Sequence, residues 1–142
     1  MYIHRTVWRF VAVSLLLCTV AAVAEDASTA AAKRLTVVKI FAFGAVGDAG
    51  KISPGENDFE IVLSQSRTAA LAEFEKLYLT GNPQGRSYAL SGIKKLNPSR
   101  FNQLLIAVAL STDQVEVEWG CIITHERIWD VAKQIDRGKF QF

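Results

Sequence analysis

Two reactive side chains stand four residues apart near the carboxyl end of the chain. Cys121 is the only cysteine after residue 24 and His125 the only histidine, so the pair could supply a nucleophile and its general base. A helix or turn would bring positions i and i+4 together, whereas an extended backbone would hold the side chains about 13 Å apart. The segment has the composition of a strand, so we expect no catalytic dyad. His125 is then expected to be a partly exposed residue near the start of a helix.

Cys121 is expected to be buried, because its neighbours Gly120, Ile122 and Ile123 are small or apolar. With no second cysteine after residue 24, an internal disulfide cannot form, and apolar packing must stabilise the fold. Two alternatives stay open: Cys121 could pair with another chain, or it could be reactive.

The same region offers only a weak metal site. Cys121, His125 and Glu126 carry three kinds of donor atom, but zinc sites usually draw on spaced pairs of cysteine or histidine. Glu116 and Glu118 alternate with apolar residues, so we expect them to face water rather than to act as an acid–base pair. The sequence therefore predicts no metal site and no catalytic residues.

A glycine-rich stretch at residues 44–50 nearly matches a phosphate-binding loop. The motif G-x-x-x-x-G-K-[ST] would begin at Ala45 and end at Ile52, and neither residue fits it. Gly50-Lys51 alone is a common dipeptide. We expect these glycines to form a structural turn, and we expect no nucleotide and no other cofactor.

Two further residues are candidates for contacts with a ligand or partner. Arg86 follows the start of a predicted helix and could hold an anion together with free backbone amides, although such an arginine is usually a surface residue. Trp129 lies beside the apolar stripe of the last predicted helix, where it could close the core or contact a partner. The weak ligand or partner candidates are therefore Arg86, Cys121, His125 and Trp129.

Helix-start signals recur through the middle of the chain. Ser53-Pro54 with Glu56 is a capping box with proline at the first helical position. Ser66, Asn82-Pro83 and Asn97-Pro98 are further caps, and Gly81 is placed to end the second helix. The short connections predict antiparallel helical hairpins. The helix after Asn97 is apolar nearly all round, so we expect it to be the central one.

The remaining segments predict a minor β component of one or two strands. Residues 35–43 are rich in β-branched and aromatic residues and favour a strand, although a short helix is an alternative. Residues 114–119 alternate apolar and polar side chains, as in a half-buried strand. Thr124 is expected to cap a final helix with an apolar stripe of Ile128, Val131, Ala132 and Ile135. The predicted fold class is thus mainly α (α+β), with four to five short helices.

The first 24 residues have the pattern of a secretory signal peptide. A short segment with Arg5 and Arg9 precedes an uncharged run from Phe10 to Ala24, which ends in Ala22-Val23-Ala24. We expect cleavage after Ala24 and a periplasmic or secreted protein, with an uncleaved anchor and a lipoprotein at Cys18 as alternatives. The domains predicted are a signal peptide at 1–24, a flexible linker at 25–33 and one compact helical domain at 34–142.

Composition excludes several classes of protein. Half of the 142 residues are hydrophobic and 21% are charged, which excludes wholesale disorder. There is one long apolar run, so we expect no membrane span after removal of the leader. Without Arg5 and Arg9, the 16 basic residues fall to the number of acidic residues, 14. A neutral chain without a basic cluster predicts that nucleic acid is not a partner.

Several short motifs resemble those of small exported bacterial proteins of unknown function. They are Phe43-Gly44-Ala45-Val46-Gly47 with Ala49-Gly50, Ser53 with Gly55-Glu56, Gly85-Arg86 with Tyr88-Ala89-Leu90 and Gly92, and Gly120-Cys121-Ile122. The resemblance implies export and a shared compact fold, but no reaction. The sequence therefore favours a non-catalytic protein-interaction module whose partner is another protein. The alternative is a small enzyme or ligand-binding protein that uses Cys121, His125 or Arg86.

Overall fold

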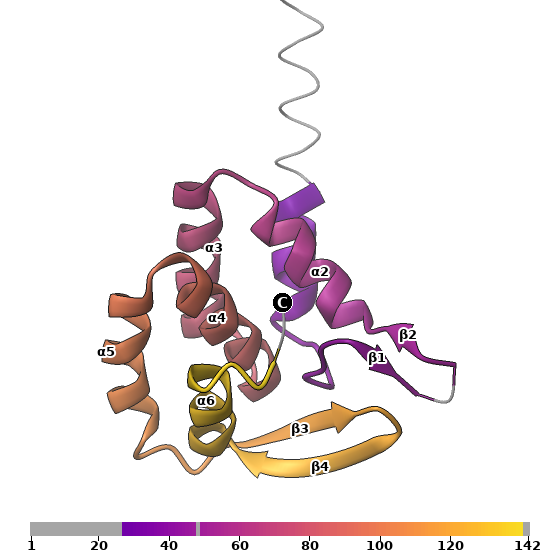
Figure 1. Ribbon diagram of the computed structural model, residues 1–142. Coiled ribbons are helices and arrows are strands. Elements are labelled where there is room, and N and C mark those ends of the chain that lie inside the picture. The colour runs from indigo at the N-terminus through magenta and orange to yellow at the C-terminus, as the bar shows by residue number, and fades with distance from the viewer. Residues whose placement is uncertain (1–26, 48, 141–142) are drawn as a thin grey trace, which may run out of the picture.

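The computed structural model describes residues 27–47 and 49–140 (Figure 1). The predicted signal peptide lies outside these residues. The described part is mainly α-helical with two small antiparallel sheets, which confirms the predicted fold class. A helix covers residues 27–35. The elements that follow are β1 (Ala45–Val46), β2 (Lys51–Ile52), α2 (Pro54–Leu63), α3 (Arg67–Thr80), α4 (Pro83–Leu96), α5 (Pro98–Val108), β3 (Gln114–Trp119), β4 (Ile122–Arg127) and α6 (Ile128–Asp136).

The caps predicted for α2, α3, α4 and α5 are confirmed. Each cap side chain accepts a hydrogen bond from the backbone N–H three residues later, which satisfies one of the donors that a helix start leaves free. The four capping residues are Ser53, Ser66, Asn82 and Asn97. Gly81 follows α3 directly, as predicted.

The centre of the core is α4, and the expectation that α5 is central is wrong. Helix α4 contacts α2, α3, α5, α6 and β3, and every residue from 87 to 93 is buried. Helix α5 buries Phe101, Leu104 and Val108 but leaves Ile106 76% exposed. This largely apolar helix therefore lies at the periphery, because neighbouring helices cover only one of its faces (Figure 1).

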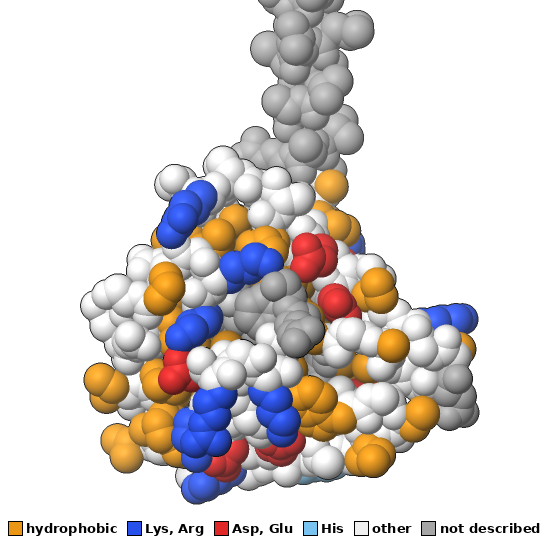
Figure 2. Space-filling view, in the orientation of Figure 1, with side chains coloured by type: hydrophobic (Ala, Val, Ile, Leu, Met, Phe, Trp, Pro, Cys, Tyr) orange, Lys and Arg blue, Asp and Glu red, His pale blue; other side chains and the backbone are white. Residues whose placement is uncertain are grey.

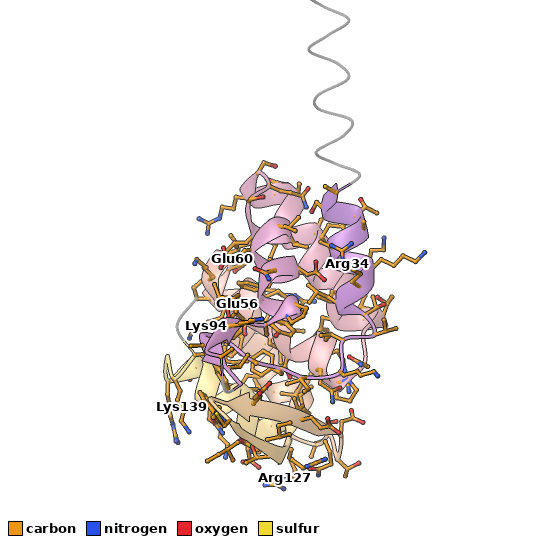
Figure 3. All side chains as sticks on the ribbon, turned by 90° about the vertical axis from the view of Figure 1, so that its right-hand side faces the viewer. Arg34, Glu56, Glu60, Lys94, Arg127 and Lys139 are labelled. Carbon is orange, nitrogen blue, oxygen red and sulfur yellow. The ribbon has the colours of Figure 1, made fainter. Side chains whose placement is uncertain are left out.

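The flexible linker expected at residues 25–33 is wrong for residues 27–33, which are helical. Ser28 and Ala31 are buried on the inner face of this helix, and Leu35 at its end is fully buried. Arg34 forms an ion pair with Asp58 of α2, with 2.6 Å between Nη2 and Oδ1 (Figure 3). Residues 27–33 contain no large apolar side chain, and their small buried side chains still let them pack against the core.

Residues 35–43 do not form the strand that their composition favours. The chain leaves the helix at residue 35 and runs irregularly to Phe41, which makes one isolated parallel bridge to Val117 of β3. Phe41 and Phe43 are nonetheless buried, and their rings meet edge to face. Their β-type composition reflects burial in an aromatic cluster rather than membership of a sheet.

The two sheets are hairpins whose ends meet. Strand β1 pairs with β2, and β3 pairs with β4 through a two-residue turn at Gly120-Cys121. Gly120 has φ of +59°, as the first central residue of a type II′ turn requires. The Gly47 N–H donates to the Gly120 carbonyl at 2.7 Å, so the turns of both hairpins are joined (Figure 1).

The start of the last helix differs from the prediction. Thr124 lies within β4 and caps nothing, and α6 begins at Ile128 after Arg127, whose side chain makes no capping hydrogen bond. The predicted apolar stripe is confirmed, because Ile128, Val131 and Ile135 are buried. None of the helices in the described ranges has both the length and the apolar character needed to cross a bilayer.

Candidate functional site

Cys121 is exposed, so the expectation that it is buried is wrong. It occupies the second position of the β3–β4 turn, beside Gly120. A hairpin turn lies at the margin of a two-stranded sheet, where little can cover it. Apolar neighbours in the sequence did not predict burial, because Ile122 and Ile123 are themselves exposed.

His125 lies in β4, opposite Glu116 of β3, rather than at the start of a helix. Its Nε2 lies 3.4 Å from Oε1 of Glu116, and its side chain is 66% exposed. The backbone from Ile122 to His125 is extended, which is the arrangement expected from the sequence. Successive residues in a strand rise about 3.3 Å, so the imidazole and the Cys121 thiol stand well beyond hydrogen-bond reach.

Arg86 lies on α4 and forms an ion pair with Asp113, in the loop before β3. Hydrogen bonds from Ser111 and then from Arg86 hold the pKa of Asp113 below its usual value. The Nε of Arg86 is buried and has no hydrogen-bond partner among the described residues. The charge of Arg86 is already matched by the Asp113 carboxylate. The start of α4 at Pro83 is therefore not an open anion site.

Trp129 is half-buried on α6 and packs against the core. The Nζ of Lys133 lies 5.2 Å from the centre of its ring, a cation–π contact. Of the two roles considered for Trp129, this placement favours closure of the core edge.

The four candidate residues stand on different elements and do not share a pocket. A groove that involves none of them lies between the helix at 27–35 and α3, and its charged lining residues are Lys33, Glu73 and Lys76. Two hydroxyls in this groove donate to nearby backbone carbonyls, that of Thr36 to Lys33 and that of Thr80 to Lys76. The hydroxyls of Thr36 and Thr80 are therefore already engaged as donors.

An exposed apolar surface at the hairpins was missed by sequence reasoning. Ile52 of β2 is 57% exposed, and Ile122 and Ile123 of β4 are 65% and 50% exposed. With Cys121 they are exposed residues of the two hairpins on both faces of the β3–β4 sheet, and we call this set the hairpin surface. Figure 2 shows separate hydrophobic side chains over the region that β1, β2, β3 and β4 occupy in Figure 1. The adjacent pair Ile122-Ile123 was the available signal, since in a strand two neighbouring side chains point to opposite faces and one must leave the core.

The geometry of the described residues does not suggest a metal site. No three histidine, cysteine, aspartate or glutamate side chains in ranges 27–47 and 49–140 are placed so that they could hold a metal ion. The carboxylate of Glu126, which sequence reasoning considered as a ligand, accepts hydrogen bonds from Thr124 and Gln134.

Comparisons of the chain with protein-family models, with curated proteins and with solved structures found no match. The resemblance to small exported bacterial proteins therefore stays a prediction. Function must be inferred from exposure, charge and hydrogen bonding.

Proposed function

We propose that this protein is a non-catalytic protein-interaction module that is exported to the periplasm or secreted. The observation that carries the proposal is the hairpin surface, where four exposed residues (Ile52, Cys121, Ile122 and Ile123) belong to two hairpins joined at their turns. Exposed apolar side chains stabilise contacts with other molecules, because water is released when they are covered.

The distribution of reactive groups supports the same proposal. The thiol of Cys121 and the imidazole of His125 are both exposed, and Arg86 is paired with Asp113 on another element. A small enzyme would need such groups to converge beside a cavity. The alternative function, which used these three residues, gains no support from this arrangement.

Affinity capture with variants tests the proposal. The exported protein, tagged at its carboxyl end, is compared with the double variant Ile122→Ser/Ile123→Ser on envelope extract from the source cells. The matched control is Ile106→Ser/Leu110→Ser, which removes two exposed aliphatic side chains, 76% and 92% exposed, from the α5 region.

We expect the Ile122→Ser/Ile123→Ser variant to lose one captured protein that the control variant retains. The purified partner should then bind the unsubstituted protein and the control variant but not the Ile122→Ser/Ile123→Ser variant. Equal capture by all three proteins would contradict the proposed surface. Failure to recover any stoichiometric partner would contradict the module itself.

The predicted export is tested separately by sequencing the amino terminus of the protein recovered from cells. We expect the chain to begin at Glu25, as cleavage after Ala24 requires. A chain that keeps residues 1–24 and remains in the cytosol would overturn the proposed location.

A further inference from the structure

The outer edge of β4 carries backbone groups that no strand in the described part of the chain pairs with. Along a strand, the N–H and C=O of one residue point to one edge and those of the next residue to the other. Phe41 donates to the Glu116 carbonyl at 2.8 Å and accepts from the Glu118 N–H at 3.0 Å, so these two residues of β3 face Phe41. Val117 therefore faces β4, and its partner there is Thr124.

It follows that Ile123 and His125 direct both backbone groups away from β3. The N–H of Arg127 points the same way, whereas its carbonyl lies at the start of α6. No backbone hydrogen bond from any other described residue reaches the outward groups of Ile123 or His125. Five consecutive donors and acceptors that no described residue pairs with form a template for pairing with an extended backbone.

The side chains along this edge select the kind of strand that fits. Ile123, His125 and Arg127 share one face, and Figure 3 places Arg127 at the lower margin of the molecule. This row is apolar at one end and basic at the other. The Arg127 guanidinium has one partner, Asp130 at 3.0 Å, in a pair that lies at the surface. The His125 imidazole already faces Glu116 of β3 at 3.4 Å, so the group that an added strand would complement with a carboxylate is Arg127.

A second copy of this chain complements the row poorly. Two β4 strands joined edge to edge about a two-fold axis run antiparallel and keep their faces, so the row of Ile123, His125 and Arg127 would lie beside itself. That row contains no carboxylate. The nearest acidic residue of β4, Glu126, points to the opposite face and already accepts hydrogen bonds from Thr124 and Gln134.

We infer that the free edge of β4 accepts an extended segment of another protein by strand addition, with an apolar residue beside Ile123 and a carboxylate beside Arg127. The inference rests on the proposed interaction function and specifies how the partner is held. The exposed Ile123 anchors the apolar end of the segment, and main-chain hydrogen bonds hold its extended backbone.

The direct test is amide hydrogen exchange, measured by NMR on the purified protein. The probe is the blocked peptide Glu-Thr-Glu-Thr-Val-Thr-Val, whose residues alternate so that both glutamates and one valine meet the row when the peptide runs antiparallel. The control peptide has lysine in place of both glutamates. We expect the first peptide to slow exchange of the Ile123 and His125 amides by roughly tenfold or more, and the control peptide to do so far less.

Three results would overturn strand addition to a foreign segment. One is unchanged exchange at Ile123 and His125 with millimolar peptide. Another is protection confined to other parts of the chain. The third is protection of these amides without peptide that grows with protein concentration, which would identify a second copy as the occupant of the edge.

A pair of variants separates this inference from the proposed function. His125→Ala removes the side chain, whereas His125→Pro also removes the outward N–H, and edge strands tolerate proline where the N–H faces solvent. We expect the proline variant to bind the peptide and the captured partner roughly tenfold more weakly than the alanine variant. Equal binding by both variants, with capture still dependent on Ile122 and Ile123, would refute strand addition and leave the interaction module standing.

Discussion

The hydroxyl of Tyr88 lies in the core, where it bonds to both backbone groups of Ala42. It donates to the Ala42 carbonyl at 2.9 Å, accepts from the Ala42 N–H at 3.0 Å, and lies 3.3 Å from the Ser53 hydroxyl. Ser53 in turn caps α2. One phenol therefore holds the irregular segment before β1 and the start of α2 against the central helix, in a region where no regular sheet satisfies the backbone.

Replacement of Tyr88 by phenylalanine is expected to lower the free energy of unfolding by roughly 1–3 kcal/mol. The ring still fills its place, but the buried Ala42 N–H loses its partner. Chemical denaturation measures the loss. The matched control is Tyr78→Phe, a half-buried tyrosine on α3, and an equal loss in both variants would contradict the role given to the Ala42 contacts.

The same residue predicts a dependence of stability on alkaline pH. Burial raises the pKa of Tyr88 to about 12, while hydrogen bonds from Ser53 and Ala42 act against this rise. The neutral phenol is thus the stable form in the core. Its contribution to the free energy of unfolding is fully present below the pKa of tyrosine in the unfolded chain, about 10. That contribution is lost as the pH rises through the folded-state pKa of about 12. Between pH of about 10 and about 12, the free energy of unfolding should fall more steeply with rising pH for the unsubstituted protein than for Tyr88→Phe.

At the scale of elements, the packing of α3 on α4 depends on a missing side chain. A Cβ at Gly92 would lie 2.4 Å from two ring carbons of Phe74, which is fully buried on α3. Phe74 also packs against Phe59 of α2, with ring centres 5.3 Å apart. The ring cannot move aside without disturbing a third element, so glycine at this position sets how closely α3 and α4 approach.

Gly92→Ala is expected to destabilise the protein by roughly 1–3 kcal/mol through overpacking, although alanine favours helices by about 1 kcal/mol over glycine. Thermal unfolding followed by circular dichroism shows directly whether the substitution lowers or raises stability. As a control, Asn102→Ala on an exposed face of α5 should leave stability unchanged or slightly raised. A stabilised Gly92→Ala variant would show that propensity outweighs the contact.

At the scale of the whole molecule, the helix at residues 27–35 completes the fold. It contributes Ala31 and Leu35 to the core, and its Arg34 reaches the buried Asp58 of α2. A Cβ on Gly85 of α4 would lie only 2.3 Å from the Leu35 carbonyl oxygen, so the end of this helix contacts α4 closely. The helix is therefore fitted to the central element rather than attached loosely to it.

Leu35→Ala is expected to lower the free energy of unfolding by roughly 2–5 kcal/mol, as for other fully buried leucines. Val37→Ala is the control, because Val37 lies two residues away and is 72% exposed. Denaturant titration should show little change for the control. Similar stability of the two variants would mean that residues 27–35 do not belong to the cooperative unit.

The sequence alone determined the features that depend on neighbours within about four residues. The caps at Ser53, Ser66, Asn82 and Asn97 act through hydrogen bonds to the third residue after them, and the alternation at residues 114–119 is a property of one strand. The extended backbone between Cys121 and His125 was likewise predicted, since it follows from local composition.

Tertiary structure alone decided what is covered and by what. Ile106 and Ile123 are exposed while small residues such as Ala31 are buried, because burial depends on segments far away in the sequence. The turn at Gly120-Cys121 folds β4 back on β3, which exposes the thiol and leaves one strand edge open. Whether an edge is free is a property of the assembled sheet, and no residue type along β4 encodes it.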